Sequence, residues 1–248
     1  MKLPHPPIIL VLTPSSTLGR VAWASILVGI VCAAVVTIDI VTGRRQPMRI
    51  MNVVWPLTSL YGSVLALAAY FRFGRAMRSR GILGADRVDH MNHEMNHSTR
   101  PMPVATVLST THCGAGCMLG DILAEGGLFV LGGAALLGSP LLTSYVFDFI
   151  AAYIFGILFQ YFAIASMRHL SAQKTLVQAI KADTLSLVAF QIGMYAWMAF
   201  YQKLLFHDRL KADSPIYWFM MQLGMLAGFL TSYPMNWLLI RRRIKESM

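Results

Sequence analysis

The sequence predicts an all-α protein, a polytopic transmembrane helical bundle of about six spans. Of its residues, 56% are hydrophobic and only 13% are charged, a balance unlike that of ordinary soluble domains. The apolar residues gather in six long runs. Each run approaches the roughly 20 residues that a helix needs to cross the hydrocarbon of a bilayer. Because these runs use most of the chain, one bundle is favoured over two domains.

The expected organisation has five parts: a tail at 1–20, two spans within 21–70, a polar His- and Met-rich loop at 71–103, four spans within 104–240, and a basic tail at 241–248. The six spans are expected at about 21–41, 51–70, 109–137, 144–167, 184–206 and 215–240. Pro56 predicts a bend in the second span. The amphipathic segment 168–183 lies along the membrane surface or extends the fifth span.

The formal net charge of +10 lies mostly in the connections between the apolar runs. This pattern indicates membrane orientation and not nucleic-acid binding. Six spans put both termini on one side, which then holds fifteen Lys and Arg residues against six on the other. The positive-inside rule therefore predicts that both termini and the His/Met loop lie in the cytoplasm. If one span is miscounted, that assignment inverts.

A polar stripe begins the third span. Cys113, Cys117, Asp121 and Glu125 follow one another every fourth residue, which places them on one face of a helix. An acid at the centre of a span costs roughly 2.5–3.5 kcal/mol on insertion scales, so an inward-facing, functional role is expected. Beside the stripe, a ridge of small residues allows another helix to approach closely: Gly116, Gly120 and Ala124.

Thiolates bind soft metals, and two cysteines one helical turn apart can face the same ion. Cys113 and Cys117 supply half of a tetrahedral site. His112 projects about 100° away from them and needs a bent helix start to join. The remaining ligands must come from the loop, another span or a bound molecule. We expect copper first and zinc second as the ion, with Asp121 beyond the thiols as a further ligand.

The loop between the second and third spans contains DHMNHEMNHS. Its three histidines, His90, His93 and His97, share one helical face and alternate with methionines. Imidazole and thioether groups suit copper, zinc or nickel better than Mg or Ca. The same composition also fits a flexible loop that binds metal only adventitiously.

Three other interpretations of the stripe remain open. In the first interpretation, the cysteines are small packing residues and the acids are paired to Lys or Arg. In the second, the cysteines are a redox pair, although four-residue helical spacing gives poor disulfide geometry. In the third, Asp121 and Glu125 carry protons in turn. A second stripe on the fourth span, Asp148, Ala152, Gly156 and Gln160, is expected to be helix packing with inter-helix hydrogen bonds.

Four segments resemble a bacterial family of multi-pass membrane proteins catalogued as a domain of unknown function: HCGAGCMLGD, NVVWPLTSLYG, KADTLSLVAFQIGMYAWM and GFLTSYPMNWLLI. The resemblance covers nearly everything from the second span to the C-terminus. It implies a polytopic helical membrane protein with HC-x3-C-x2-GD as a family feature. It implies no substrate or reaction.

The leading hypothesis is a bacterial inner (plasma) membrane protein that binds a thiophilic metal for transport, sensing or buffering. Its proposed route passes from the loop to the stripe and then to further acids: His90, His93 and His97, then His112, Cys113 and Cys117, then Asp121 and Glu125, then Asp148 and Asp39. No nucleotide is expected, because no Walker-type phosphate loop is present.

The alternatives are a non-catalytic accessory subunit or assembly factor and a membrane-embedded oxidoreductase, so an enzyme is the less favoured class. The expected partners are the lipid bilayer and the metal ion, with a second copy or a partner membrane subunit left open and no nucleic acid.

Overall fold

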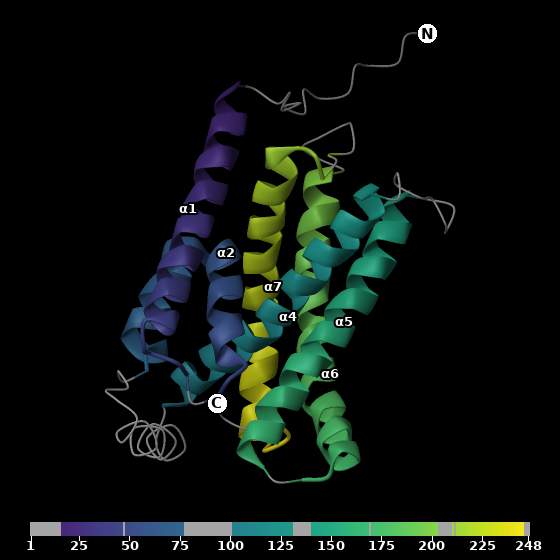
Figure 1. Cartoon of the computed structure of the whole chain (residues 1–248). Coiled ribbons are helices and arrows are strands. Elements are labelled where there is room, and N and C mark those ends of the chain that lie inside the picture. The colour runs from purple at the N-terminus through teal and green to yellow at the C-terminus, as the bar shows by residue number, and fades with distance from the viewer. Residues whose placement is uncertain are drawn as a thin grey trace.

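The computed structural model describes residues 16–46, 48–76, 101–130, 140–168, 170–202, 210 and 212–245, and the regular secondary structure of this part of the chain is all helical. The long helices are α1 (Ser16–Val41), α2 (Met51–Ala69), α4 (Met102–Val130), α5 (Pro140–Met167), α6 (Ala172–Phe200) and α7 (Pro215–Arg241). A short π-helix, η1 (Tyr70–Gly74), continues α2. The helices lie side by side as one bundle (Figure 1). The predicted all-α bundle is confirmed.

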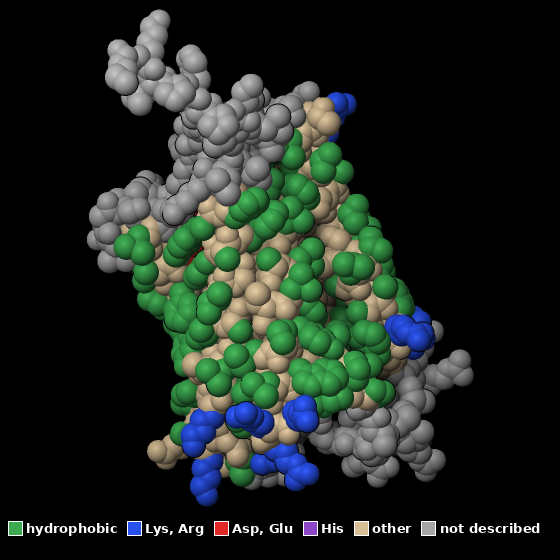
Figure 2. All heavy atoms as spheres, turned by 180° about the vertical axis from the view of Figure 1, so that it is seen from behind, with side chains coloured by type: hydrophobic (Ala, Val, Ile, Leu, Met, Phe, Trp, Pro, Cys, Tyr) green, Lys and Arg blue, Asp and Glu red, His purple; other side chains and the backbone are tan. Residues whose placement is uncertain are grey.

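Five segments among the described residues are long and apolar enough to cross a membrane: 17–41, 51–74, 102–130, 142–166 and 215–241. α6 is as long but more polar, because its first half carries Lys174, Lys181 and Asp183. The predicted amphipathic segment is thus part of α6. Figure 2 shows hydrophobic side chains covering most of one face, with Lys and Arg gathered mainly at the end where α7 finishes. Such a surface suits lipid.

The segment 51–74 folds back on itself, although its length and composition suit a span. In a straight helix Trp55 and Tyr70 lie about 22 Å apart, yet their ring centroids are 5.4 Å apart. The reversal falls at Ser63, whose φ of 44° and ψ of −123° break the helix. Each limb has about a dozen residues and reaches about 18 Å. The prediction of one continuous span is therefore wrong in geometry, and Pro56 is accommodated within the first limb.

The turn of this hairpin is stabilised from α1 and α7. The Gln222 side-chain amide donates to the carbonyl oxygen of Leu60 at 2.7 Å and accepts from Ser25 Oγ at 2.8 Å. A broken helix frees backbone acceptors, and each is costly if it stays unpaired in a low-dielectric interior. Gln222 therefore supplies a partner that lipid cannot.

The remaining helices run from end to end of the bundle. Antiparallel packing joins α6 to α7, where Ser232 Oγ donates to the Ser186 carbonyl at 2.9 Å and Trp197 Nε1 donates to the Met220 carbonyl at 3.1 Å. The bundle has two ends. We call the one where α1 finishes the Asp39 end, and the opposite one the Ser144 end. The start of α1 and the end of α7 lie at opposite ends (Figure 1).

This arrangement changes the predicted topology. Both termini were expected on one side because six crossings were counted. The hairpin returns to the Asp39 end, so α1, α4, α5, α6 and α7 make five passages between the ends of the bundle. Because five is an odd number, the two ends of the described chain lie at opposite ends of the bundle. The prediction that both termini lie on one side therefore does not follow from this arrangement.

The predicted ridge of small residues forms the contact between α4 and α5. A Cβ atom on Gly116 would lie 2.7 Å from Gly156 Cα, and one on Gly120 would lie 2.4 Å from the Ala152 nitrogen. Only glycine permits such a close approach of two backbones. The ridge of small residues on α4 therefore faces Ala152 and Gly156 of the stripe predicted on the fourth span.

Candidate functional site

A group of carboxylates lies inside the Ser144 half of the bundle. Asp121 and Glu125 on α4 and Asp148 on α5 are buried, with exposed fractions of 0%, 6% and 0%. Ser144 Oγ donates a hydrogen bond to Glu125 Oε1. Neither oxygen of Asp121 has a hydrogen-bond partner among the described residues. The stripe on α4 thus faces protein, as its sequence spacing predicts.

Tyrosines from three helices surround these acids. Tyr195 on α6 donates to the Tyr145 carbonyl at 2.9 Å, and the two rings stack with centroids 4.7 Å apart. Tyr217, near the start of α7, is buried beside Glu125. Within the described parts of the chain, no Lys, Arg or His forms an ion pair with Asp121 or Glu125. The interpretation in which these two acids are paired to Lys or Arg thus has no support from the described contacts.

Cys117 lies one turn along α4 from Asp121, and Cys113 lies about two turns from it. Cys113 and Cys117 are fully buried in the main core and are not joined in a disulfide. The tip of the hairpin reaches this level, since a Cβ on Gly114 would lie 2.4 Å from Tyr61 Oη. Among the described residues, no three His, Cys, Asp or Glu side chains are grouped so that they could hold a metal ion. The thiols therefore form at most half of a site.

His112 lies away from the thiols. Its ring is fully buried and meets the Phe159 ring edge to face, with centroids 6.0 Å apart. Neither ring nitrogen has a hydrogen-bond partner in the described structure. Its charged neighbours are Asp183 and Lys245. α4 begins at Met102, ten residues before His112, so His112 lies inside the helix and no bent helix start brings it to Cys113 and Cys117.

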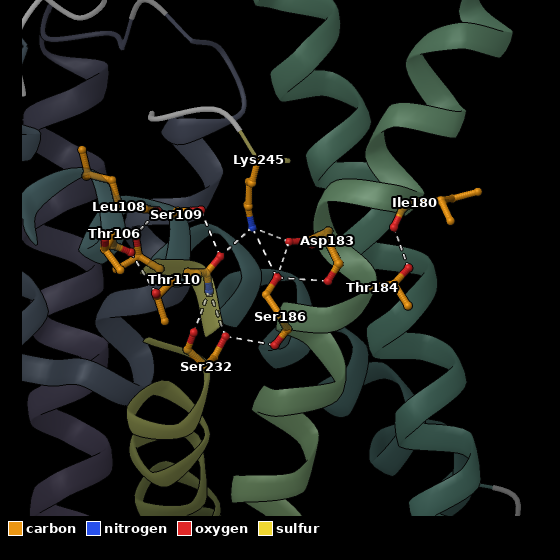
Figure 3. A network of polar contacts seen from close by, with 12 residues as sticks. Thr106, Leu108, Ser109, Thr110, Ile180, Asp183, Thr184, Ser186, Ser232 and Lys245 are labelled. Atoms are coloured by element: carbon orange, nitrogen blue, oxygen red, sulfur yellow. Dashed lines mark hydrogen bonds and ion pairs between the residues drawn. The ribbon is translucent and has the colours of Figure 1, made fainter. Parts of the chain in front are cut away.

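A second polar group occupies the Asp39 half of the bundle (Figure 3). Lys245 Nζ lies 2.5 Å from Asp183 Oδ1, and both side chains are fully buried. Asn236 and Ser186 also contact the ammonium. Sequence reasoning missed this pair because Lys245 belongs to a basic tail and Asp183 to an amphipathic segment. The only sequence signal is that Asp183 directly precedes an apolar run.

Asp39 is neutralised locally. Arg75 donates to its carboxylate at 2.6 and 2.9 Å, Tyr70 donates at 2.9 Å, and Arg44 lies 3.6 Å away. The carboxylate in turn raises the pKa of Arg75 above its ordinary value. Asp39 therefore fastens the hairpin to α1.

Asp39 does not join the other acids of the predicted route. The neighbouring Ile40 packs in one cluster with Leu108 of α4, and Leu108 precedes Asp121 by about 20 Å along the helix. The predicted loop ligands His90, His93 and His97 lie outside the described residues.

Long apolar helices that pack around buried acids define a multi-pass membrane protein. The chain belongs to the family described as Domain of unknown function (DUF4396), which matches residues 104–245. A comparison with curated proteins gave no match, and a comparison with solved structures gave none either. The family resemblance is confirmed for α4 to α7. The match does not include the hairpin, and the family role of HC-x3-C and a bacterial origin stay predictions.

Proposed function

We propose that this protein moves a cation across the membrane and that Asp121 and Glu125 bind it on the way. The observation that carries the proposal is the burial of both carboxylates, one helical turn apart, without an ion-pair partner among the described residues. Two such acids in a low-dielectric interior hold protons or a cation, because two bare negative charges at this spacing repel strongly.

The hydroxyl groups around the acids support a binding role. Ser144 donates to Glu125, and Tyr217 lies beside it. Asp121 keeps both oxygens without a hydrogen-bond partner among the described residues, so they are available to a proton or an ion. A residue that served only packing at this position would be apolar, since burying an unsatisfied carboxyl is costly.

The hairpin formed by α2 and η1 also supports transport over a passive scaffold. Broken helices at membrane depth occur where the backbone is enclosed in protein or lines a water-filled path. Its tip, at Tyr61, reaches Gly114 in the middle of α4. A movement of this short element would change access to the thiols and acids without moving a whole span.

A thiophilic metal, copper first and zinc second, is the cation that the thiols favour. Cys113 and Cys117 offer two soft ligands within about two helical turns of Asp121. Further ligands would come from a bound molecule or from the loop with His90, His93 and His97. Sensing or buffering of the same ion would use the same residues without flux. A non-catalytic accessory subunit is the alternative if no cation moves.

We place the protein in the plasma membrane with the Asp39 end in the cytoplasm. Arg20 lies in the first turns of α1, at the Ser144 end. The Lys and Arg residues in the described connections and helix ends at the Asp39 end are far more numerous: Arg44, Arg45, Arg49, Arg72, Arg75, Arg168, Lys174, Arg241, Arg242 and Arg243. The positive-inside rule then sets the orientation.

The test is cation flux into proteoliposomes that contain the purified protein, measured separately for Cu(I), Zn²⁺ and protons. We expect Asp121→Asn and Glu125→Gln to reduce flux to the level of empty vesicles, whereas the exposed Asp213→Asn serves as a matched control with normal flux. Cys113→Ser/Cys117→Ser should abolish metal flux and spare proton flux. No flux of any of these ions by the wild type would overturn the proposal.

A further inference from the structure

An oxygen cage surrounds the ammonium of Lys245 at the Asp39 end. Its Nζ lies 2.5 Å from Asp183 Oδ1, 2.9 Å from Asn236 Oδ1 and 3.3 Å from Ser186 Oγ. Asp183 and Ser186 belong to α6, and Asn236 belongs to α7. The Lys245 side chain has no exposed surface. The ammonium thus occupies a site built by two helices.

The cage oxygens are held in place by groups other than the lysine (Figure 3). Ser186 Oγ lies 2.8 Å from Asp183 Oδ1. The Asn236 amide nitrogen donates to the Ser232 carbonyl and hydroxyl oxygens, both at 3.0 Å, which turns its carbonyl oxygen toward the cage. Ser109 donates to that same oxygen at 3.1 Å. The cage oxygens therefore have hydrogen bonds that do not depend on the ammonium.

The donor set selects the class of ion. All three contacts are oxygen atoms, which suit hard cations and not copper or zinc. Asp183 is the single carboxylate, so one positive charge neutralises the cage, whereas a divalent ion would leave an uncompensated charge in a low-dielectric interior. Asp183 Oδ2 is also buried without a hydrogen-bond partner among the described residues, so it offers one more acceptor.

Lys245 reaches the cage from a turn and not from a helix. The chain reverses at Arg243, whose φ is 56°, and the Ile244 nitrogen donates back to the Leu239 carbonyl at 3.0 Å. This positive φ and this hydrogen bond end α7 in a Schellman-type cap. The residues of the turn, Arg242 to Ile244, are exposed. Withdrawal of Lys245 therefore requires this surface turn to open and the three contacts of the ammonium to break.

We propose that Asp183, Asn236 and Ser186 form a binding site for a monovalent cation of the K⁺, Na⁺ or ammonium class, and that Lys245 is a tethered cation that occupies it. Free ion and lysine exclude each other, because the cage balances one positive charge. The site uses neither Asp121 nor Glu125, so it stands or fails apart from the proposed transport.

The test measures thermal unfolding of the detergent-purified protein in KCl, NaCl or NH₄Cl against choline chloride at equal ionic strength. In Lys245→Met we expect the small cations to raise the melting temperature by several degrees, since a ligand that binds only the folded state stabilises it. The wild type should respond much less, and Lys245→Met/Asp183→Asn should not respond. Equal melting temperatures of Lys245→Met in all four salts, or a response retained in the double variant, would overturn the proposal.

A second measurement needs no variant, should Lys245→Met fail to fold. Reductive methylation of the wild type, read by mass spectrometry at each lysine, reports when Lys245 leaves the cage. We expect K⁺ or Na⁺, compared with choline, to increase methylation of Lys245 several-fold and to leave the exposed Lys174 unchanged. Methylation of Lys245 that does not depend on the small cation would reject displacement.

Discussion

Trp55 and Tyr70 meet edge to face, with ring centroids 5.4 Å apart, although they lie fifteen positions apart in one apolar segment. Gly74 passes against the same indole, because a Cβ there would lie 2.1 Å from the Trp55 ring. These contacts make the segment a hairpin that enters and leaves at the Asp39 end. The membrane topology, and the side on which each connection lies, follow from this relationship.

Labelling of single cysteines in intact cells checks the hairpin. Arg49→Cys and Arg72→Cys should react with a membrane-impermeant maleimide from the same side, shared with Ser171→Cys. Asp213→Cys should react from the other side. The native cysteines are buried and should stay silent. Labelling of positions 49 and 72 from opposite sides would show that 51–74 crosses the membrane.

Gln222→Leu should destabilise the protein by about 1–3 kcal/mol, because the Leu60 carbonyl and the Ser25 hydroxyl lose their partner in a partly buried setting. Reversible unfolding in mixed micelles measures the loss. Gln173→Leu, at an exposed position of α6, is the matched control and should stay near the wild type. Equal effects of both substitutions would mean that Gln222 does not support the turn.

Gly120→Ala should cost about 1–3 kcal/mol of stability, because the added methyl group meets the Ala152 backbone and pushes α5 away from α4. Gly126→Ala lies on the same helix with no atom within 4 Å of its new Cβ. It should be neutral or slightly stabilising, since alanine is the better helix former. Unfolding of the two variants side by side compares them, and a harmless Gly120→Ala would contradict the close packing.

Metal retention separates the thiols from the neighbouring histidine. Wild-type protein purified after exposure to Cu(I) should retain more copper than Cys113→Ser/Cys117→Ser, because the two sulfurs face the same side of α4. His112→Ala should retain as much as the wild type, since its ring packs on Phe159. Elemental analysis of the purified proteins gives the answer. If His112→Ala lost as much copper as the double serine variant, His112 would be a ligand of the site.

The buried ion pair should show strong coupling in choline buffer. Lys245→Met and Asp183→Asn should each destabilise by about 3–5 kcal/mol, because each leaves one buried charge or dipole without its partner. The double variant should lose less than the sum of the two single losses. A double-mutant cycle from unfolding free energies measures the coupling. Additive losses would mean that the two side chains do not depend on each other.

Periodicity in the sequence was sufficient for several features. The apolar runs predict a helical membrane bundle, and the four-residue spacing of Cys113, Cys117, Asp121 and Glu125 predicts their shared, inward face. The spacing of Gly116 and Gly120 predicts the close contact that α5 makes. These features depend on the regular geometry of one helix, which residue spacing describes directly.

Three other features depend on contacts between distant segments. The reversal at Ser63 needs Gln222 from α7, the separation of His112 from the thiols depends on the position of Phe159, and the Lys245 cage needs Asp183, sixty-two positions away.

The sequence by itself therefore determined that this protein lies in a membrane, that it is built of helices, and that α4 has a polar face. Hydrophobicity and helical repeat are local properties, which a sequence shows directly. Only the tertiary structure decided which polar groups meet and how many times the chain passes between the ends of the bundle. Hydrogen bonds and ion pairs act over a few ångströms, and only folding brings residues remote in the chain within that range.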